Sequence, residues 1–501
     1  MNASKSVLAF DAGGGSIRAL QIEYSGDRLT FNQLARFDNG PVAAGPGLYW
    51  DILGLYKNLK ESLLIASNKG VEVTSFGIDT WGNDFALLDR SGYLMENPFC
   101  YRDKRTENCV SYVNGLISGR DIFHLNGIQQ VRMNTMYQLV SLARDRAYIF
   151  DYADKLLFVP DLLAYYLTGE MHSEYTMSTI SQLYSYTSGN WNFSLMSRLG
   201  VPGKLFSPVI MPGTSLGTML PSVCREIGIK PIKLTAVGSH DTASAVAAVP
   251  APEGYPLYIS SGTWSIVGTE TDAPVINDDT YAFNCSNEGG VNDRIRLLKN
   301  VMGLWILQEV QRRFAAEGRR YTFEELSRLA EDAMPFRSVI DPDDEVFYEP
   351  ADMPEVIRDY CRRTGQPVPD SDGSITRTVL ESLAFKYRYV VDGLDRLTGT
   401  RHEEIFVVGG GAKNSLLCRF TAASCGRPVN AGPTEATALG NGLVQLMSLG
   451  ELANYREART LVKRSFPPEV HMPCDTERWE EEYGRFLAVT GLAGLPGNKS
   501  E

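Results

Sequence analysis

The feature that most constrains the fold is a pattern that occurs twice, once near the start of the sequence and once past its middle. Residues 6–24 read SVLAFDAGGGSIRALQIEY: an apolar run, a glycine turn, then apolar residues that alternate with polar ones. Residues 256–270 read PLYISSGTWSIVGTE and repeat this order. A period of two predicts β-strands, so each stretch predicts a strand–turn–strand hairpin. Two similar hairpins in two halves indicate a duplicated fold.

The stretch VPAPEGYP, residues 249–256, is the densest Pro/Gly segment of the middle chain and predicts a domain boundary. A chain of 501 residues is too long for one ordinary hydrophobic core. We therefore expect domains at 1–248 and 249–501. Strand-like runs alternate with helical ones, and Val379 to Leu397 carry an apolar stripe at spacings of three or four. This mixture predicts the α/β class.

Composition excludes several classes of function. The formal net charge is −12 and no run of five or more Lys and Arg residues occurs, which argues against nucleic acid as a partner. No apolar run is long enough for a membrane helix and the first residues resemble no leader, so we expect a cytoplasmic protein without a membrane partner. The eight cysteines lack C-x-x-C spacing and are expected to be reduced and mostly buried, and five histidines without H-E-x-x-H make zinc improbable.

The first glycine turn fits neither common phosphate motif. A dinucleotide fingerprint needs a third glycine where Arg18 stands, and a helix where a strand follows. A Walker A loop needs a lysine that the chain lacks at this place. Two interpretations remain: a plain turn, or a hairpin whose exposed amides hold phosphate beside the carboxylate of Asp11. Two such hairpins from two domains could hold one polyphosphate from opposite sides, as in the actin-like and hexokinase-like superfamily.

Ten segments, in order, resemble the FGGY family of carbohydrate kinases, and within it the rhamnulokinases. They are GIDTWGNDFALLD (77–89), YRDKRT (101–106), NTMYQL (134–139), PDLLAYYLTGE (160–170), SHDTASAV (239–246), YISSGTWSIVG (258–268), NEGG (287–290), LKNVMGLWILQ (298–308), VVGGGAKNSLL (407–417) and GPTEATALGN (432–441). The resemblance implies two ribonuclease H-like domains of the actin/hexokinase-like ATPase type, with the active site in the cleft between them. Residues 1–248 would hold the sugar and the first phosphate loop, and residues 249–501 the nucleotide.

The resemblance also implies roles for particular residues. Asp241 would be the catalytic base that takes the proton of the sugar hydroxyl, and Asp11 would hold Mg²⁺ with Asp241 nearby. The other implied sugar contacts are Gly82, His240, Thr242 and Asn300, and the implied ATP contacts are Gly14, Gly15, Ser16, Ile17, Arg18, Thr263, Gln308 and Gly410.

Simpler roles remain open for several of these residues. Asp241 could merely cap a helix, and Asp11 could form an Asx turn with the amide of Gly13 or Gly14. Three glycines at 409–411 could simply end a strand. The charged turn at 101–105 is expected to be a solvated or salt-bridged loop without chemistry.

The implied function is ATP- and Mg²⁺-dependent phosphorylation of a primary hydroxyl of a ketose, here L-rhamnulose to L-rhamnulose 1-phosphate. The first loop departs from the A-S-S-G-R usual in rhamnulokinases, and Asn83 stands where Val is common, so a more polar pocket could favour a sugar with an extra hydroxyl. The alternatives are a kinase for L-fuculose or another ketose or polyol, a sugar sensor without catalysis, and a structural actin-like ATPase. We expect a monomer or homodimer.

Overall fold

The structure, a computed structural model, describes residues 4–348 and 350–492. The chain forms two compact units. Unit 1 contains Met1–Ala248, Glu270–Leu297 and Glu435–Ser465, and unit 2 contains Val249–Thr269, Leu298–Thr434 and Phe466–Glu501. The chain therefore passes from one unit to the other near residue 249 and returns to unit 1 twice, so neither unit is one continuous segment. Sequence alone gave no sign of these two returns.

The sheet of unit 1 has six strands in the order β13-β14-β6-β1-β2-β3. Their bounds are β1 Lys5–Ala12, β2 Ser16–Tyr24, β3 Leu29–Asp38, β6 Val73–Thr80, β13 Ser215–Thr218 and β14 Lys233–Thr235. Strands β1, β2 and β3 form an antiparallel meander, which confirms the first predicted hairpin, while β6 is parallel to β1 and β14 to β6.

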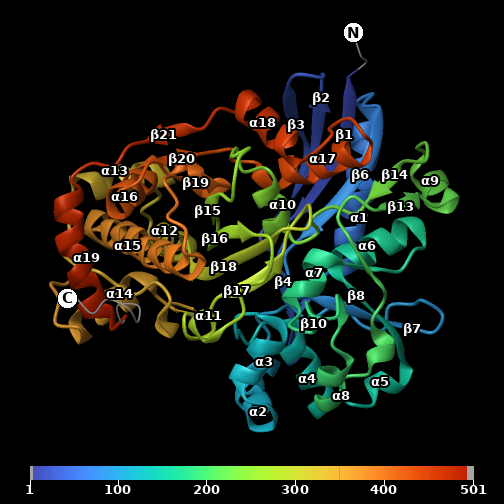
Figure 1. The fold of residues 1–501 in the computed structure, drawn as a ribbon, viewed down its shortest axis with the longest axis horizontal. Coiled ribbons are helices and arrows are strands. Elements are labelled where there is room, and N and C mark those ends of the chain that lie inside the picture. The colour runs from blue at the N-terminus through green and yellow to red at the C-terminus, as the bar shows by residue number, and fades with distance from the viewer. Residues whose placement is uncertain (1–3, 349, 493–501) are drawn as a thin grey trace. The chain divides into compact units, whose positions relative to one another are not determined.

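Both faces of β1 are covered, because its residues alternate between two packed layers. Leu8 and Phe10 belong to a core with residues of α1 and α6. Val7, Ala9 and Asp11 must point to the opposite face. Helix α17, from the distant C-terminal part of the chain, packs on β1 and β6, as Figure 1 shows by its orange-red colour beside the blue strands.

The remaining elements of unit 1 are helices and short strands, many of them in a long insertion between β6 and β14. The helices are α1 Ile52–Asn68, α2 Cys109–Leu116, α3 Gly119–Asn126, α4 Thr135–Asp145, α5 Ile149–Tyr152, α6 Val159–Thr168, α7 Tyr175–Ile180, α8 Phe193–Arg198, α9 Pro221–Ile227, α10 Asp241–Ala247, α11 Asp278–Ala282, α17 Ala436–Ser448 and α18 Tyr455–Ser465. Short strands are β4 Pro41–Ala44, β5 Gly47–Trp50, β7 Phe85–Asp89, β8 Ala153–Phe158, β9 Ser173–Glu174, β10 Tyr184–Ser185, β11 Asn190–Trp191, β12 Val209–Ile210 and β17 Ser286–Gly289, with 3-10 turns at Lys104–Thr106 and Gly203–Leu205. The insertion has a second core around the antiparallel β7–β8 pair.

The second large sheet has seven strands in the order β17-β18-β16-β15-β19-β20-β21. Its further bounds are β15 Leu257–Ser261, β16 Trp264–Thr271, β18 Ile295–Met302, β19 Ile405–Val408, β20 Val429–Ala431 and β21 Glu469–His471. Strands β15 and β16 are antiparallel, which confirms the second hairpin, and β15, β19 and β20 are parallel neighbours. The central order β18-β16-β15-β19-β20 repeats β3-β2-β1-β6-β14, so the duplicated α/β fold is confirmed.

Unit 2 packs long helices against its sheet. They are α12 Trp305–Ala316, α13 Phe323–Asp332, α14 Met353–Arg363, α15 Asp372–Thr398, α16 Ser415–Cys425 and α19 Thr476–Thr490, with 3-10 turns at Glu345–Phe347 and Gly410–Lys413. The stripe predicted from Val379 to Leu397 lies within α15, which starts earlier because Ser371 and Ser374 form a capping box. Figure 1 shows α15 beside α16, and Trp479, Tyr483 and Phe486 of α19 are buried.

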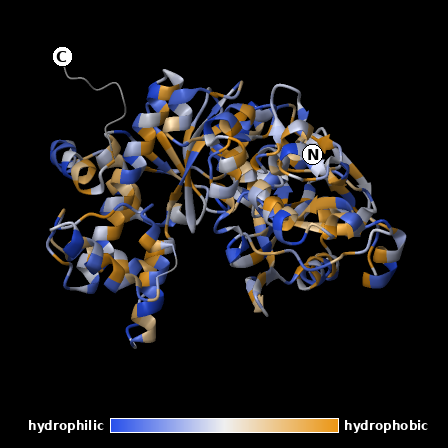
Figure 2. Ribbon diagram, turned by 90° about the horizontal axis from the view of Figure 1, so that it is seen from below, coloured by the Kyte–Doolittle hydropathy of each residue, from blue (hydrophilic) through white to orange (hydrophobic). Residues whose placement is uncertain are grey.

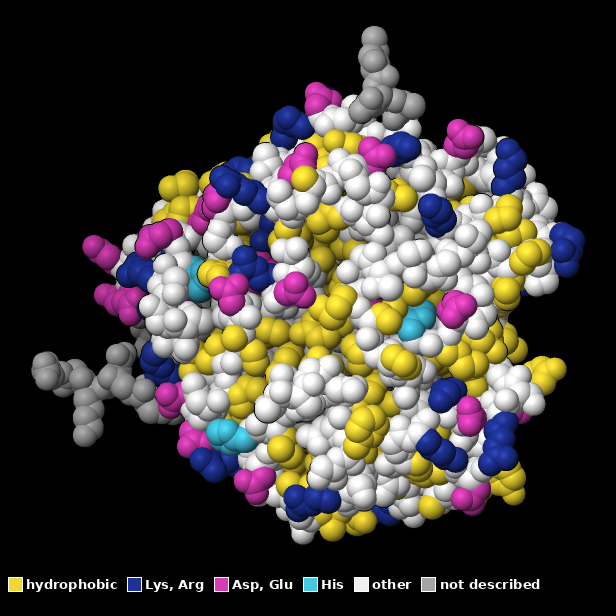
Figure 3. All heavy atoms as spheres, turned by 45° about the vertical axis from the view of Figure 1, so that its right-hand side comes forward, with side chains coloured by type: hydrophobic (Ala, Val, Ile, Leu, Met, Phe, Trp, Pro, Cys, Tyr) yellow, Lys and Arg dark blue, Asp and Glu magenta, His cyan; other side chains and the backbone are white. Residues whose placement is uncertain are grey.

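Surface properties agree with the composition. Most helices in Figure 2 carry both hydrophilic and hydrophobic stretches, as amphipathic packing requires. On the face drawn in Figure 3, Lys and Arg side chains are interspersed with Asp and Glu. Within residues 4–348 and 350–492, no helix is long and apolar enough to cross a membrane. All eight cysteines are free thiols, six of them buried.

A buried ion pair in unit 1 yields a stability prediction. Nη1 of Arg459 on α18 lies 2.8 Å from Oε2 of Glu270 on β16, and the two side chains are 3% and 1% exposed. The substitution Glu270→Gln would leave the guanidinium buried without its counter-charge. We expect the free energy of unfolding to fall by about 3 to 5 kcal/mol, measured by urea denaturation. The matched control, Arg120→Gln, breaks an exposed pair with Asp278 and should change stability little. Equal losses in the two variants would contradict the prediction.

Candidate functional site

The polar residues of unit 1 gather where neighbouring strands end at one edge of the sheet. Asp11 near the end of β1 is in register with Asp79 of β6. The amide of Trp81 donates to the carbonyl of Ala12 (3.3 Å), and the amide of Thr80 donates to the carbonyl of Ser239 (2.9 Å). Because these backbones are hydrogen-bonded side by side, the residues that follow each strand share one edge, as in other α/β sites.

Three carboxylates meet at this edge, from Asp11, Asp79 and Asp241. Burial, and then the charge of Asp11, raise the pKa of Asp241 to about 7. Burial, and then the charge of Asp11, also hold the pKa of Asp79 well above its ordinary value. Oδ2 of Asp79 accepts a hydrogen bond from Nδ2 of Asn441 (2.6 Å), while its buried Oδ1 has no partner among the described residues. The edge is therefore an acidic site with an unused acceptor.

Arg18 supplies the positive charge of this edge. It is in register with Asp11 across the β1–β2 pair, and residues directly opposite share a face of the sheet. One guanidinium nitrogen lies 2.5 Å from Oδ2 of Asp11, and the other lies 2.5 Å from Oε2 of Glu435. Arg18 thus bridges the hairpin to the residue before α17 and partly neutralises Asp11.

The glycine turn between β1 and β2 does not need glycine for its backbone conformation. The φ angles of Gly13, Gly14 and Gly15 lie outside the left-handed region, and a Cβ built on Gly15 would meet no atom within 4 Å. Neither strain nor a close neighbour therefore requires glycine at Gly15. Ser16 opens β2, and the Ile17 side chain is buried in the core, so only its backbone faces outward.

The alternative role of Asp11 is not the one observed. The amide of Gly13 donates to the carbonyl of Ser16 (2.9 Å), whereas Oδ2 of Asp11 accepts from Arg18. The described contacts of Asp11 are thus those of an ion pair, and they include no Asx turn with Gly13.

Asp241 is the first residue of α10, and the residue at the N-cap position is His240. Asp241 is therefore not the N-cap residue, although its carboxylate accepts a hydrogen bond from an amide of the first helical turn. Its Oδ1 accepts from the amide of Thr242 (2.7 Å) and from the hydroxyl of the same residue (3.2 Å). The Asp241 side chain is 31% exposed, so a substrate hydroxyl has access to it.

His240 and Gly82 lie beside Asp241. Nε2 of His240 is 3.5 Å from Oδ1 of Asp241, and a Cβ built on Gly82 would lie 3.3 Å from the same nitrogen. Burial, and then the charge of Arg296, hold the pKa of His240 well below its ordinary value. The imidazole is therefore neutral, and it carries one proton. Gly82, His240, Asp241 and Thr242 thus form one group, as the resemblance implies.

Asp84 organises the aromatic residues next to this group. Its Oδ2 accepts from the indoles of Trp50 (2.6 Å) and Trp81 (2.9 Å) and from the amide of Tyr101 (3.1 Å), and its Oδ1 accepts from Gln138 (2.9 Å). The two indole rings lie 4.0 Å apart by their centroids. Burial raises the pKa of Asp84 to about 6 although four hydrogen bonds oppose the shift.

The charged turn at 101–105 is not the solvated loop that was one of the two expected forms, since Lys104 is the only one of its five residues that is exposed. Asp103 is 6% exposed and accepts from the amide of Leu48 (2.7 Å). The guanidinium of Arg105 lies 3.9 Å from the centroid of the Phe99 ring. A Cβ built on Gly14 would lie 3.9 Å from the Tyr101 hydroxyl, so this turn packs beside the glycine hairpin. Short-range charge could not reveal the burial of Asp103, because its partner Leu48 lies 55 positions away in the sequence.

In unit 2 the second hairpin brings another group of predicted residues together. The amide of Trp305 donates to the carbonyl of Thr263 (3.1 Å), which fixes the start of α12 against the hairpin. The hydroxyl of Thr263 lies 3.5 Å from Oε1 of Gln308, one turn into α12. Asn300 lies on β18 and is partly exposed.

The three glycines that follow β19 have different roles. Gly409 has a left-handed φ of +82°, and a Cβ on Gly411 would lie 2.0 Å from Oγ of Ser261, so both are required by the fold. A Cβ on Gly410 would meet nothing within 4 Å. The simpler interpretation, in which the glycines only end the strand, therefore explains Gly409 and Gly411. It does not explain Gly410, whose surroundings leave space for another group.

Four residues of the unit 1 site were not singled out from the sequence: Asp79, Asp84, Arg296 and Glu435. The sequence could have indicated two of them, because each is an ionisable residue within an apolar run that predicts a strand. Such residues are rarely buried without a role. Asp79 lies in the run SFGIDTW, and Arg296 lies in RIRLL. Glu435 had no such signal, since its partner Arg18 is 417 positions away.

The sequence is similar to that of known proteins over nearly its whole length. Residues 6–248 match the model of the N-terminal domain of the FGGY family of carbohydrate kinases, and residues 257–449 match that of its C-terminal domain. The rhamnulokinase of Bacteroides thetaiotaomicron is 40% identical over 482 residues, which cover 96% of this chain and 99% of that protein. The rhamnulokinase of Pectobacterium atrosepticum is 36% identical over 505 residues, covering 100% and 99%.

Solved structures share the fold at much lower identity. A ligand-bound xylulose kinase from Lactobacillus acidophilus has a TM-score of 0.79 at 14% identity and covers 97% of each chain. A glycerol kinase from Plasmodium falciparum, solved with ADP, has a TM-score of 0.76 at 15% identity, covering 98% of this chain and 99% of that one. These likenesses confirm the expected two-domain α/β fold.

The four hydrogen bonds to Asp84 yield a prediction. In Asp84→Asn an amide group replaces one acceptor and faces N–H donors, so we expect the free energy of unfolding to fall by about 2 to 3 kcal/mol, measured by urea denaturation. The matched control is Asp89→Asn, because both amides bonded to Asp89 use Oδ1, which asparagine retains. The control should stay within about 0.5 kcal/mol of the parent protein. A loss in Asp84→Asn no larger than this would refute the organising role of Asp84.

Proposed function

The chain belongs to the FGGY family of carbohydrate kinases, and from that premise we propose that it phosphorylates L-rhamnulose with ATP to give L-rhamnulose 1-phosphate. The relatives named rhamnulokinase, at 36% and 40% identity over nearly the whole chain, support this sugar. The observation that carries the proposal is the position of Asp241, a partly exposed carboxylate at the sheet edge beside Asp11.

In the proposed reaction Asp241 takes the proton of the C1 hydroxyl, whose oxygen attacks the γ-phosphorus as the bond to ADP breaks. A base with a pKa near the working pH suits this role, and Asp241 has a pKa raised to about 7. Most of the acceleration in phosphoryl transfer comes from positioning and from neutralising charge. Gly82, His240, Thr242 and Asn300 are the residues that we propose to hold the sugar.

For ATP we propose that each domain contributes one phosphate hairpin. In residues 1–248 these are the amides of Gly14, Gly15, Ser16 and Ile17 with the Arg18 side chain. In residues 249–501 the second hairpin contributes Thr263, and Gln308 of α12 and Gly410 after β19 are further nucleotide contacts. The open space at Gly15 and Gly410 supports close approach of the nucleotide.

The acidic edge fits Mg²⁺. The negative charge of each of Asp11, Asp79 and Asp241 makes ionisation of the other two less favourable, and a bound cation would reduce this repulsion. Over the described ranges 4–348 and 350–492 no cluster of three or more acidic, His or Cys side chains can hold a metal by itself. Mg²⁺ usually keeps several waters and binds through one or two carboxylates and the phosphates. When bound, it would neutralise phosphate charge. Asp11 and Asp241 would hold it.

One observation favours a related sugar as a second candidate. Asn83 adopts a left-handed φ of 74°, and its buried Oδ1 has no partner in the part of the chain that the structure describes. Asparagine tolerates this conformation far better than the β-branched Val common at this place in the family. The Asn83 side chain, next to Gly82, can form a hydrogen bond with an additional sugar hydroxyl. L-Fuculose or another ketose or polyol is therefore the alternative substrate.

The proposal predicts the outcome of a substrate panel. With ATP and Mg²⁺, we expect L-rhamnulose to give the highest kcat/KM for sugar-dependent ADP release among L-rhamnulose, L-fuculose, L-ribulose, D-xylulose and glycerol. Phosphorus NMR of the product should show a phosphomonoester on C1. A higher kcat/KM for another sugar would transfer the proposal to that sugar. ATP binding without stimulation by any sugar would refute the kinase function and favour a sensor.

The pKa of Asp241 predicts a pH dependence. Below about pH 7 a growing fraction of Asp241 is protonated and cannot accept the hydroxyl proton, so kcat/KM for the sugar should fall as the pH decreases, with an acid limb near 7. Asp241→Asn should lower kcat by about 10²- to 10⁴-fold without changing the melting temperature greatly. The exposed Asp278→Asn is the matched control and should keep parent activity. An Asp241→Asn variant with parent kcat would place the base elsewhere.

A further inference from the structure

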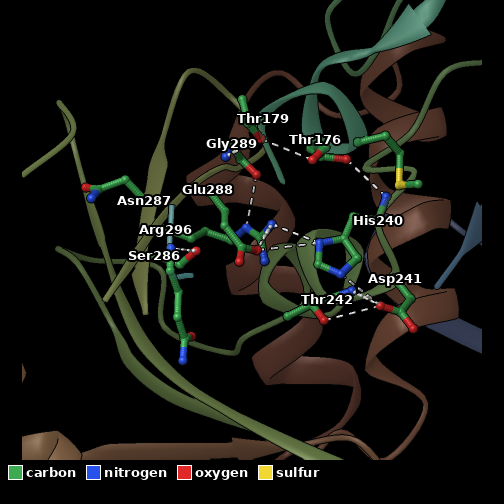
Figure 4. Close-up of polar contacts among 12 residues, drawn as sticks. Thr176, Thr179, His240, Asp241, Thr242, Ser286, Asn287, Glu288, Gly289 and Arg296 are labelled. Carbon is green, nitrogen blue, oxygen red and sulfur yellow. Dashed lines mark hydrogen bonds and ion pairs between the residues drawn. The ribbon is translucent and has the colours of Figure 1, made fainter. Parts of the chain in front are cut away.

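Arg296 on β18 is the largest fully buried side chain of the described residues, and it contacts the proposed sugar site. Figure 4 shows its guanidinium between Glu288 and the ring of His240, with Asp241 and Thr242 near the other side of the ring. Its Nε donates to the carbonyl of Gly289 (3.0 Å), and its Nη2 lies 3.1 Å from Oε2 of Glu288 and 3.3 Å from Nδ1 of His240. The side chain is therefore held in a fixed orientation against the imidazole.

The contact between Arg296 and His240 has only one chemically consistent direction. A guanidinium has N–H donors and no acceptor, so Nδ1 of His240 must be the unprotonated, accepting nitrogen. A proton on Nδ1 would face the donor of Arg296 at 3.3 Å. Oε2 of Glu288 is a competing acceptor for such a proton, but it lies farther from Nδ1, at 3.6 Å, and already accepts from Arg296.

The proton of the neutral ring is then on Nε2. This nitrogen faces Oδ1 of Asp241 at 3.5 Å, which is too long for a strong hydrogen bond, and it faces the backbone of Gly82. The site therefore presents an N–H donor next to the carboxylate acceptor. Two neighbouring oxygens of a ligand, one that accepts a hydrogen bond and one that gives up a proton, match this pair.

The backbone of His240 is fixed by a second set of contacts, which closes a ring of hydrogen bonds through α7. The amide of His240 donates to the hydroxyl oxygen of Thr176 (3.0 Å), and that hydroxyl donates to Oε2 of Glu174 (2.5 Å). The amide of Gly289 donates to the hydroxyl oxygen of Thr179 (2.8 Å). Thr176 and Thr179 lie on the same short helix, so the ring leads back to Arg296 through Gly289 (Figure 4).

We propose that Arg296 is a positioning residue that fixes His240 in the Nε2–H tautomer, and that this N–H donates to the C2 oxygen of the ketose while Asp241 takes the proton of the C1 hydroxyl. The sugar contact rests on the proposed function, whereas the tautomer rests on the contacts of Arg296 alone. The C2 oxygen is next to the reacting C1 oxygen, so the pair aligns the attacking hydroxyl.

The first test is a nitrogen-15 NMR spectrum of the sugar-free, full-length protein labelled at histidine, with the His240 signal assigned by its loss in His240→Asn. We expect a protonated Nε2 and an unprotonated Nδ1. A protonated Nδ1 would overturn the proposal and would mean that Glu288 sets the tautomer. This measurement needs no variant of Arg296 and no turnover.

The second test removes the buried pair together, as Arg296→Met with Glu288→Gln, because this leaves no lone buried charge. We expect the nitrogen-15 signals of His240 to shift toward a mixture of tautomers. We also expect kcat/KM for the ketose to fall by about tenfold or more, with the KM for ATP within about twofold.

The matched control is Thr179→Val, which breaks the same ring of hydrogen bonds at Gly289 without touching the His240 side chain. It should lower the melting temperature, but it should leave the tautomer and the sugar kinetics near those of the parent. Equal losses of sugar kcat/KM in the control and the double variant would overturn the proposal, because Arg296 would then be only structural. If the parent protein phosphorylates no sugar, the proposed function fails, and the nitrogen-15 spectrum still decides the tautomer.

Discussion

The site of unit 1 depends on a backbone constraint: parallel neighbours in one sheet deliver three carboxylates to the same edge. Strand register places Asp11 beside Asp79, and a backbone hydrogen bond from Thr80 to Ser239 brings Asp241 to the same place. Buried acids close together resist ionisation, so this arrangement is costly unless other groups offset it. The surrounding residues can be understood as the groups that do so.

Asn441 of α17 and Arg18 of β2 offset part of this cost, whereas burial and then the charge of Glu435 raise the pKa of Asp11. Asn441 donates to Asp79, and Gln445 donates to the carbonyl of Leu8 (3.0 Å). Glu435, just before this helix, shares Arg18 with Asp11. Close packing makes these contacts possible, because Gly440 lets α17 approach α10: a Cβ there would lie 1.7 Å from the carbonyl of Ser244. A helix from the end of the chain thus completes a site that begins at residue 11.

Around Asp241 the structure separates groups that handle charge from groups that fix geometry. Asp84 holds two indoles through its carboxylate, and Arg296 holds one imidazole through its guanidinium. Each is a buried ion that is hydrogen-bonded to side chains and backbone of the site. Such groups add little net stability, since desolvation offsets their attraction, but they leave their partners few orientations. Orientation is what a reaction that depends on positioning requires.

The sequence by itself determined the two hairpins, the α/β class and the family, because alternation, glycine turns and ordered motifs are local properties of the chain. It also pointed to Asp11, His240 and Asp241, which lie directly before or after predicted strands. Only the tertiary structure decided that Asp103 is buried, that His240 rather than Asp241 is the N-cap residue of α10, and that Arg18 pairs with Glu435. These contacts join residues far apart in the sequence, 55 positions for Leu48 and Asp103 and 417 for Arg18 and Glu435, and no local pattern contains that information.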